Sequence, residues 1–92
     1  MPDLLAPSYT HISSAVIGVL DAHLSDIVRR IQALPGAEVM HAEGNKLIVV
    51  METAGSKEAG AHLAAISTFK GVISASLVYE HAEATESLGE IV

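Results

Sequence analysis

Five histidines and a surplus of carboxylates are the side chains of this chain with the most obvious capacity for chemistry. The histidines are spread along the sequence, at His11, His23, His41, His62 and His81. No two of them stand four positions apart and no HExxH sequence occurs, so no helix offers the paired imidazoles of a zinc site. We expect solvated or polar-cluster histidines and no bound metal.

The chain also lacks the arrangements that mark a nucleophile or a phosphate-binding loop. It has no cysteine, no GxSxG sequence, and neither a GxxxxGK nor a GxGxxG loop. The pair Ser13-Ser14 has no obvious His and Asp companions, and two neighbouring hydroxyls on a strand are usually structural. We therefore expect a binding protein and not an enzyme, with no catalytic residue and no cofactor.

The composition predicts one small folded domain with an acidic surface. Of the 92 residues, 50% are hydrophobic, and 11 acidic against 5 basic side chains give a formal net charge of −6. Nucleic-acid binding needs clusters of Lys and Arg, which are absent. The first ten residues have neither the basic start nor the apolar core of a secretory signal. The longest apolar run, Leu47–Met51, is far shorter than the ~20 residues that span a bilayer, so we expect a cytoplasmic protein without membrane insertion.

Hydrophobic periodicity predicts four strands and two helices in the order βαββαβ. The predicted strands cover residues 11–20, 37–42, 46–53 and 72–80. Apolar residues recur at steps of three and four over residues 24–34 and 59–69, which indicates the two helices. Asp21 and Ser56 are the candidate N-caps, and Gly44-Asn45 is the expected turn between the middle strands.

This order favours a ferredoxin-like α+β fold built from two interleaved βαβ units. The glycines that end the two helices, Gly36 and Gly71, are separated by about the length of one such unit. Right-handed crossovers then place both helices on one face of a four-stranded antiparallel sheet of order 4-1-3-2. The predicted domain covers residues 10–80, between an N-terminal leader of residues 1–9 and an acidic C-terminal tail of residues 81–92.

Strand alternation predicts which residues lie on the sheet face that the helices leave open. In the third strand, Leu47, Val49 and Met51 are assigned to the helix side, so Ile48 and Val50 face outward. In the second and fourth strands, which form the two edges of the sheet, the predicted inward residues are Ala37, Val39, His41, Ile73, Ala75, Leu77 and Tyr79.

The open face is therefore predicted to combine apolar residues, serines and glutamates. Its members are Ile12, Ser14, Val16, Glu38, Met40, Ile48, Val50, Glu52, Ser74, Ser76, Val78 and Glu80. An apolar patch ringed by carboxylates indicates a surface for a foreign partner. Weak self-association through this face, or a tail folded over it, are the alternatives.

Four segments of the chain resemble the NapD family of small chaperones. They are His11–Ile17, Leu34–Val39, Gly44–Val50 and Gly71–Tyr79, and the resemblance spans roughly residues 10–80. The most specific pieces are HISS near the start and GVISASLVY at the end, whereas the middle matches only in residue type.

The resemblance implies the ferredoxin-like fold and a particular partner. Members of this family are cytoplasmic chaperones of the periplasmic nitrate reductase. They bind the twin-arginine signal peptide of its catalytic subunit and delay export until the molybdenum cofactor is loaded. The family is not enzymatic and holds no cofactor.

On this interpretation the open face is the signal-peptide-binding site. Its apolar residues suit the apolar stretch of the peptide, and its carboxylates suit the arginine forks. A peptide lying as a helix across the face is favoured over one added as an edge strand. The alternative function is a small-molecule-sensing regulatory domain that acts as a homodimer.

Overall fold

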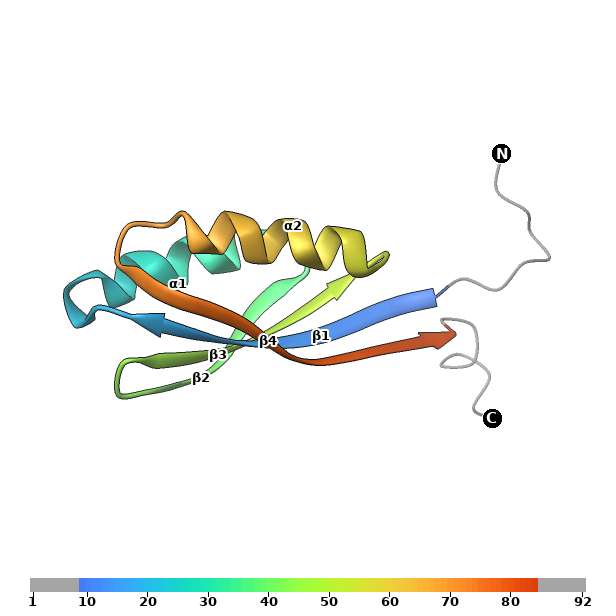
Figure 1. The fold of residues 1–92 in the computed structure, drawn as a ribbon, viewed down its shortest axis with the longest axis horizontal. Coiled ribbons are helices and arrows are strands. Elements are labelled where there is room, and N and C mark those ends of the chain that lie inside the picture. Colours follow the sequence, from blue (N-terminus) through green and yellow to red (C-terminus); the bar gives the residue numbers. More distant parts are fainter. Residues whose placement is uncertain (1–8, 85–92) are drawn as a thin grey trace.

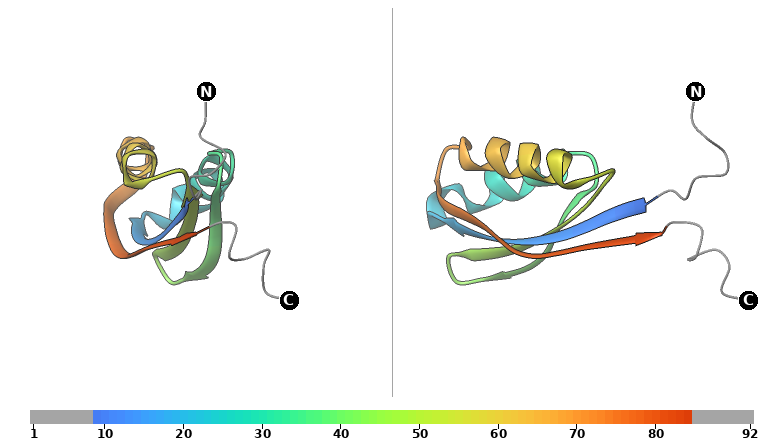
Figure 2. Two further views of the ribbon diagram at one scale, coloured as in Figure 1. Left: turned by 90° about the vertical axis from the view of Figure 1, so that its right-hand side faces the viewer. Right: turned by 45° about the vertical axis from the view of Figure 1, so that its right-hand side comes forward.

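Two helices pack on one face of a four-stranded antiparallel sheet in the computed structural model, which describes residues 9–84 (Figure 1). The elements in chain order are β1 (Tyr9–Val19), the 3-10 helix η1 (Asp21–His23), α1 (Leu24–Gln32), β2 (Ala37–Glu43), β3 (Lys46–Thr53), α2 (Ser56–Ser67) and β4 (Val72–Ala84). The strand order β2-β3-β1-β4 is the predicted order 4-1-3-2 counted from the other edge. Viewed along the strands, both helices lie on the same side of the sheet (Figure 2). The ferredoxin-like prediction is confirmed.

β1 and β4 are longer than expected at one end of the sheet. β4 continues beyond Glu80 because it pairs with the start of β1, where Tyr9 lies opposite Ala84. The two strands run on together past the helices (Figure 1). The first four residues of the predicted tail therefore belong to the sheet. The rest of that tail and residues 1–8 of the predicted leader lie outside the described residues.

Neither helix begins with the predicted side-chain cap. Asp21 starts the short 3-10 helix that precedes α1, and Ser56 is the first residue of α2 after Gly55 at the N-cap position. The turn between β2 and β3 falls at Gly44-Asn45 as expected, and Gly44 alone of the two takes a positive φ, of 59°.

The hydrophobic core fills the space between the helices and the sheet. Its fully buried members are Ala15, Ile17, Val19, Ile27, Ile31, Leu47, Val49, Met51 and Ile66. Alternate residues of β1 and β3 thus point to the helices, which confirms the predicted inward set of β3. The apolar stripe of α1 contributes Ile27 and Ile31, and α2 contributes Ile66. Ile48 and Val50 consequently lie on the opposite, uncovered face.

A register shift in β4 reverses the predicted alternation of its second half. Ser14 of β1 lies opposite Tyr79, but the next residue, Ala15, lies opposite Leu77. Val78 is therefore an extra residue in β4 with no partner in β1, as in a β-bulge. Residues directly opposite in an antiparallel pair share a face, so Tyr79 lies on the open face with Ser14 and not on the helix side as expected.

The same shift removes Glu80 from the open face. Glu80 lies opposite Ser13, which is fully buried on the helix side, and its Oε1 is 3.0 Å from His11 Nε2. Ile73, which stands at a second shift near Gly18, was expected inward but is 60% exposed. The structure thus corrects the predicted faces of Glu80 and Ile73, because alternation holds only within an unbroken register.

Gly36 connects α1 to β2 at a place where the backbone leaves no room for a side chain. Its φ is 79°, and a Cβ at this position would overlap the carbonyl oxygen of Glu52. Its own carbonyl oxygen accepts a hydrogen bond of 2.8 Å from Glu52 N–H. This contact holds the start of β2 against the end of β3.

We expect Gly36→Ala to lower the free energy of unfolding by at least about 2 kcal/mol, since it adds a backbone clash to a left-handed conformation. Urea unfolding followed by circular dichroism measures the change. Gly60→Ala is the matched control, because nothing lies within 4 Å of a Cβ at Gly60 and alanine is the better helix former. Unchanged stability of Gly36→Ala would contradict the close approach.

Candidate functional site

The centre of the open face is formed by the outward residues of β1 and β3. Val16 lies opposite Ile48, and Ser14 lies opposite Val50. All four side chains are half-buried although no described element covers this face, because each is screened by its neighbours in the sheet. The structure therefore brings these four predicted site residues together as one central patch.

The β4 edge adds the two predicted serines to this patch. Ser76 lies opposite Val16 and Ser74 lies opposite Gly18, and both serines are exposed. Val78 occupies the extra position of the β4 bulge and is 60% exposed.

An aromatic pair also lies on this edge of the face, and it was not among the predicted site residues. Tyr79 is 53% exposed, and its ring stacks on that of His81 with 6.4 Å between the ring centroids. His81 lies opposite Ile12 of β1, a predicted site residue. The sequence did not predict this pair, because the bulge that turns Tyr79 outward contains no glycine or proline that would indicate it.

The β2 edge contains the corresponding irregularity. Val39 lies opposite Val49 and His41 lies opposite Ile48, so Met40 is the extra residue. His41 was expected on the helix side, but its partner Ile48 and its exposure place it on the open face. Met40, as predicted, is exposed, with 59% of its surface accessible.

A cavity of about 350 Å³ opens on this face between β2, β3 and β1. It is lined by Ile12, Gly36, Ala37, Glu38, Met40, Val50 and Glu52. The predicted site residues among them supply three apolar side chains and two carboxylates. Neither Glu38 nor Glu52 forms an ion pair with another described residue. The cavity thus combines an apolar lining with unneutralised negative charge.

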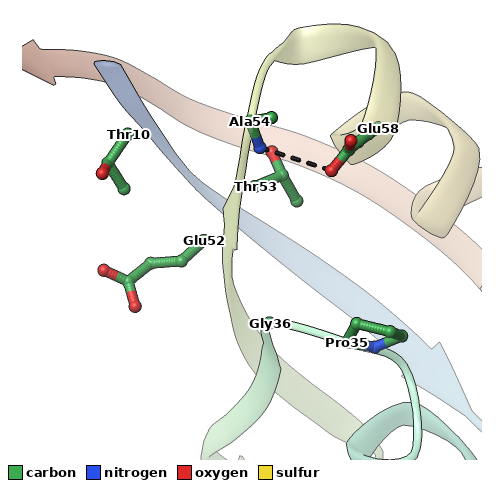
Figure 3. Close-up of a pocket in the computed structure, with 7 residues that line it drawn as sticks. All are labelled: Thr10, Pro35, Gly36, Glu52, Thr53, Ala54 and Glu58. Atoms are coloured by element: carbon green, nitrogen blue, oxygen red, sulfur yellow. Dashed lines mark hydrogen bonds between the residues drawn. The ribbon is translucent and has the colours of Figure 1, made fainter. Parts of the chain in front are cut away.

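A second cavity, of about 450 Å³, adjoins the first at the end of β3 (Figure 3). It is lined by Thr10, Pro35, Gly36, Glu52, Thr53, Ala54 and Glu58. Gly36 and Glu52 line both cavities, so the two cavities lie side by side. In Figure 3 the carboxylates of Glu52 and Glu58 lie on either side of the end of β3.

Glu58 lines the second cavity and was not among the predicted site residues. It belongs to the first turn of α2, and its Oε2 accepts a hydrogen bond of 3.3 Å from Ala54 N–H (Figure 3). A glutamate three residues after the N-cap commonly turns back to the N-cap N–H, and here it reaches one residue further, to Ala54. That spacing after Gly55 was the signal that could have placed its carboxylate beside β3.

The arginines of the chain do not neutralise these carboxylates. Arg29 and Arg30 both donate to Asp26 within α1, Arg30 from Nε to Oδ2 at 2.8 Å. The hydrogen bond from Arg30, with a further one from Arg29, lowers the pKa of Asp26 below its ordinary value. The negative charge on the open face is therefore left available to a cationic partner.

His11 and Glu80 form a separate polar cluster on the helix side of the sheet. The Nδ1 of His11 and the Oγ of the neighbouring Ser13 are buried without a hydrogen-bond partner. Within residues 9–84, no three His, Cys, Asp or Glu side chains gather in a way that could hold a metal ion. No helix of the same residues is long and apolar enough to cross a membrane.

The fold and the open face define a ferredoxin-like domain whose uncovered sheet surface is apolar at its centre and acidic at one end. Residues 10–84 match the family described as NapD protein, and the chain belongs to that family. The Chaperone NapD of Paracoccus pantotrophus is 39% identical over 72 residues, which are 78% of this chain and 64% of that protein. The solution structure of the E. coli Tat proofreading chaperone protein NapD is similar with a TM-score of 0.71 and 29% identity, over 83% of this chain and 82% of that one.

Proposed function

We propose that this protein is a chaperone that binds the twin-arginine signal peptide of the periplasmic nitrate reductase catalytic subunit on its open sheet face. Membership of the NapD family supports the chaperone role, since both relatives above are NapD chaperones. The observation that carries the site is the apolar face with the unpaired carboxylates of Glu38 and Glu52.

The two parts of the face match the two parts of such a peptide. The half-buried side chains of Val16, Ile48 and Val50 retain exposed apolar area, and its burial contributes about 25 cal/mol per Å². Carboxylates accept both N–H groups of an arginine fork, which gives the pairing a defined geometry.

A peptide helix on the face remains the favoured binding mode over a strand added at an edge. The two edge strands, β2 and β4, are each interrupted by a bulge, at Met40 and Val78. A bulge breaks the regular row of backbone donors and acceptors that an added strand would need. The face offers the apolar side chains of Val16, Ile48 and Val50 at its centre instead.

The chaperone holds back export by occupying the signal peptide. While its arginines are bound to the chaperone, they are not free for recognition by the export machinery. The chaperone acts by binding alone, and release after cofactor loading makes the signal available.

Calorimetric titration with a synthetic twin-arginine peptide tests this function. We expect the same peptide with Lys-Lys in place of Arg-Arg to bind at least about fivefold more weakly, because lysine keeps the charge and loses the fork. Equal affinities would contradict arginine recognition. No binding of either peptide would contradict the function, and a ligand-dependent homodimer in sedimentation would then favour a regulatory domain.

We also expect peptide affinity to fall as salt is raised from 0.05 to 0.5 M. Added salt shortens the Debye length, which is ~8 Å at 0.15 M, and so weakens the attraction between exposed charges. The apolar contribution should leave measurable binding at high salt. Affinity that does not change across this range, measured in the same titrations, would show that the carboxylates contribute nothing.

A further inference from the structure

We propose that the signal peptide docks in one direction, with its two arginines at the cavities beside Glu52 and its apolar stretch running along β3 toward the turn at Gly44-Asn45. This inference rests on the proposed function and adds the place and polarity of the peptide. It follows from an asymmetry of charge along the open face.

The outward row of β3 changes character from one end to the other. It begins at Lys46, continues through Ile48 and Val50, and ends at Glu52. The two terminal side chains are exposed and the two central ones are half-buried. A lysine, an apolar centre and a glutamate therefore follow one another along one strand, and Glu43 of β2 lies opposite the lysine.

The acidic end is also the end with the cavities. Glu38 lies opposite Val50 and lines the first cavity, whereas Glu58 lines the second. The two adjoining cavities thus have carboxylates on both sides of the end of β3, and Glu52 lines both of them (Figure 3). Two adjacent guanidinium groups can each find a carboxylate there, and the apolar lining of the first cavity leads from them to the central patch.

The dimensions and dipole of a helical peptide agree with this direction. The six steps from Glu52 to Lys46 span ~20 Å at ~3.4 Å per residue of strand. A helix covers that distance with about 13 residues at 1.5 Å each. Its N-terminus, which carries partial positive charge, would lie at Glu52, and its negative C-terminus would lie at Lys46. The reverse direction would place the negative C-terminus beside Glu52 and move the arginines away from Glu38 and Glu52.

Paramagnetic relaxation in NMR spectra of the full chain tests the direction. A synthetic twin-arginine peptide carries a nitroxide at its N-terminus in one experiment and at its C-terminus in another. We expect the N-terminal label to broaden the amide signals of Gly36 and Ala54, and the C-terminal label to broaden those of Gly44 and Asn45. The reversed pattern, or equal broadening at both ends by either label, would overturn the direction while leaving signal-peptide binding intact. Absence of binding would overturn the proposed function as well.

Charge-removing variants test the place of the arginines independently. Glu52→Gln and Glu58→Gln should each weaken binding of the Arg-Arg peptide roughly threefold to fivefold, as expected for a partly exposed ion pair. The matched control is Glu43→Gln, which removes the same charge opposite Lys46, at the other end of the face. It should leave the affinity nearly unchanged. An equal loss in all three variants would show that only net charge matters and would overturn the assigned place.

Discussion

Val49→Asp is expected to unfold the domain. Val49 is fully buried in the centre of β3, with Ala15 of β1 and Val39 of β2 opposite it. A carboxylate at this position would face the core under the helices, where no described basic group lies among the buried residues. Burying an unpaired charge costs several kcal/mol, and a domain has only ~5–15 kcal/mol of stability to lose.

Circular dichroism and the dispersion of amide signals in an NMR spectrum would show this loss directly. Val49→Ala is the control, because it removes apolar volume without adding charge and should cost only about 1–3 kcal/mol. That variant should remain folded with a lower melting temperature. A dispersed, native-like spectrum of Val49→Asp would mean that the two faces of β3 have been interchanged.

The face assignment of β3 could be made from the sequence because its central register is unbroken. Residues 47–53 pair with β1 without interruption, so the alternation of Leu47, Val49 and Met51 with Ile48 and Val50 is preserved in three dimensions. The order and connection of the strands and helices could also be predicted from the sequence, since helix-ending glycines and apolar periodicity are local signals.

The faces of the edge strands could not be predicted in the same way. After the bulges at Met40 and Val78, each residue lies on the face opposite to the one that simple alternation predicts. His41 and Tyr79 therefore point outward and Glu80 points inward. A bulge is decided by how two strands pair, and neither position carries a residue type that favours one. Alternation within a single strand therefore contains no information about it.

Ile48→Asp, one residue before Val49, is expected to fold normally and to lose signal-peptide binding. Ile48 is half-buried on the uncovered face, between Val16 of β1 and His41 of β2. In the free protein the new carboxylate can reach water, so its cost to stability is small. In the complex it would be desolvated against the apolar stretch of the peptide, where interface anchors contribute most of the binding energy.

We expect Ile48→Asp to weaken binding by at least about 100-fold, which corresponds to ~2.8 kcal/mol, with a circular dichroism spectrum like that of the parent. Ser25→Asp is the matched control, because it adds the same charge at an exposed position of α1 in the other layer of the domain. It should bind as the parent does. If Ile48→Asp unfolds, the face assignment of β3 is reversed. If it folds and still binds the peptide, the sheet face is not the site, and the bulged edge strands β2 and β4 become the surfaces to test.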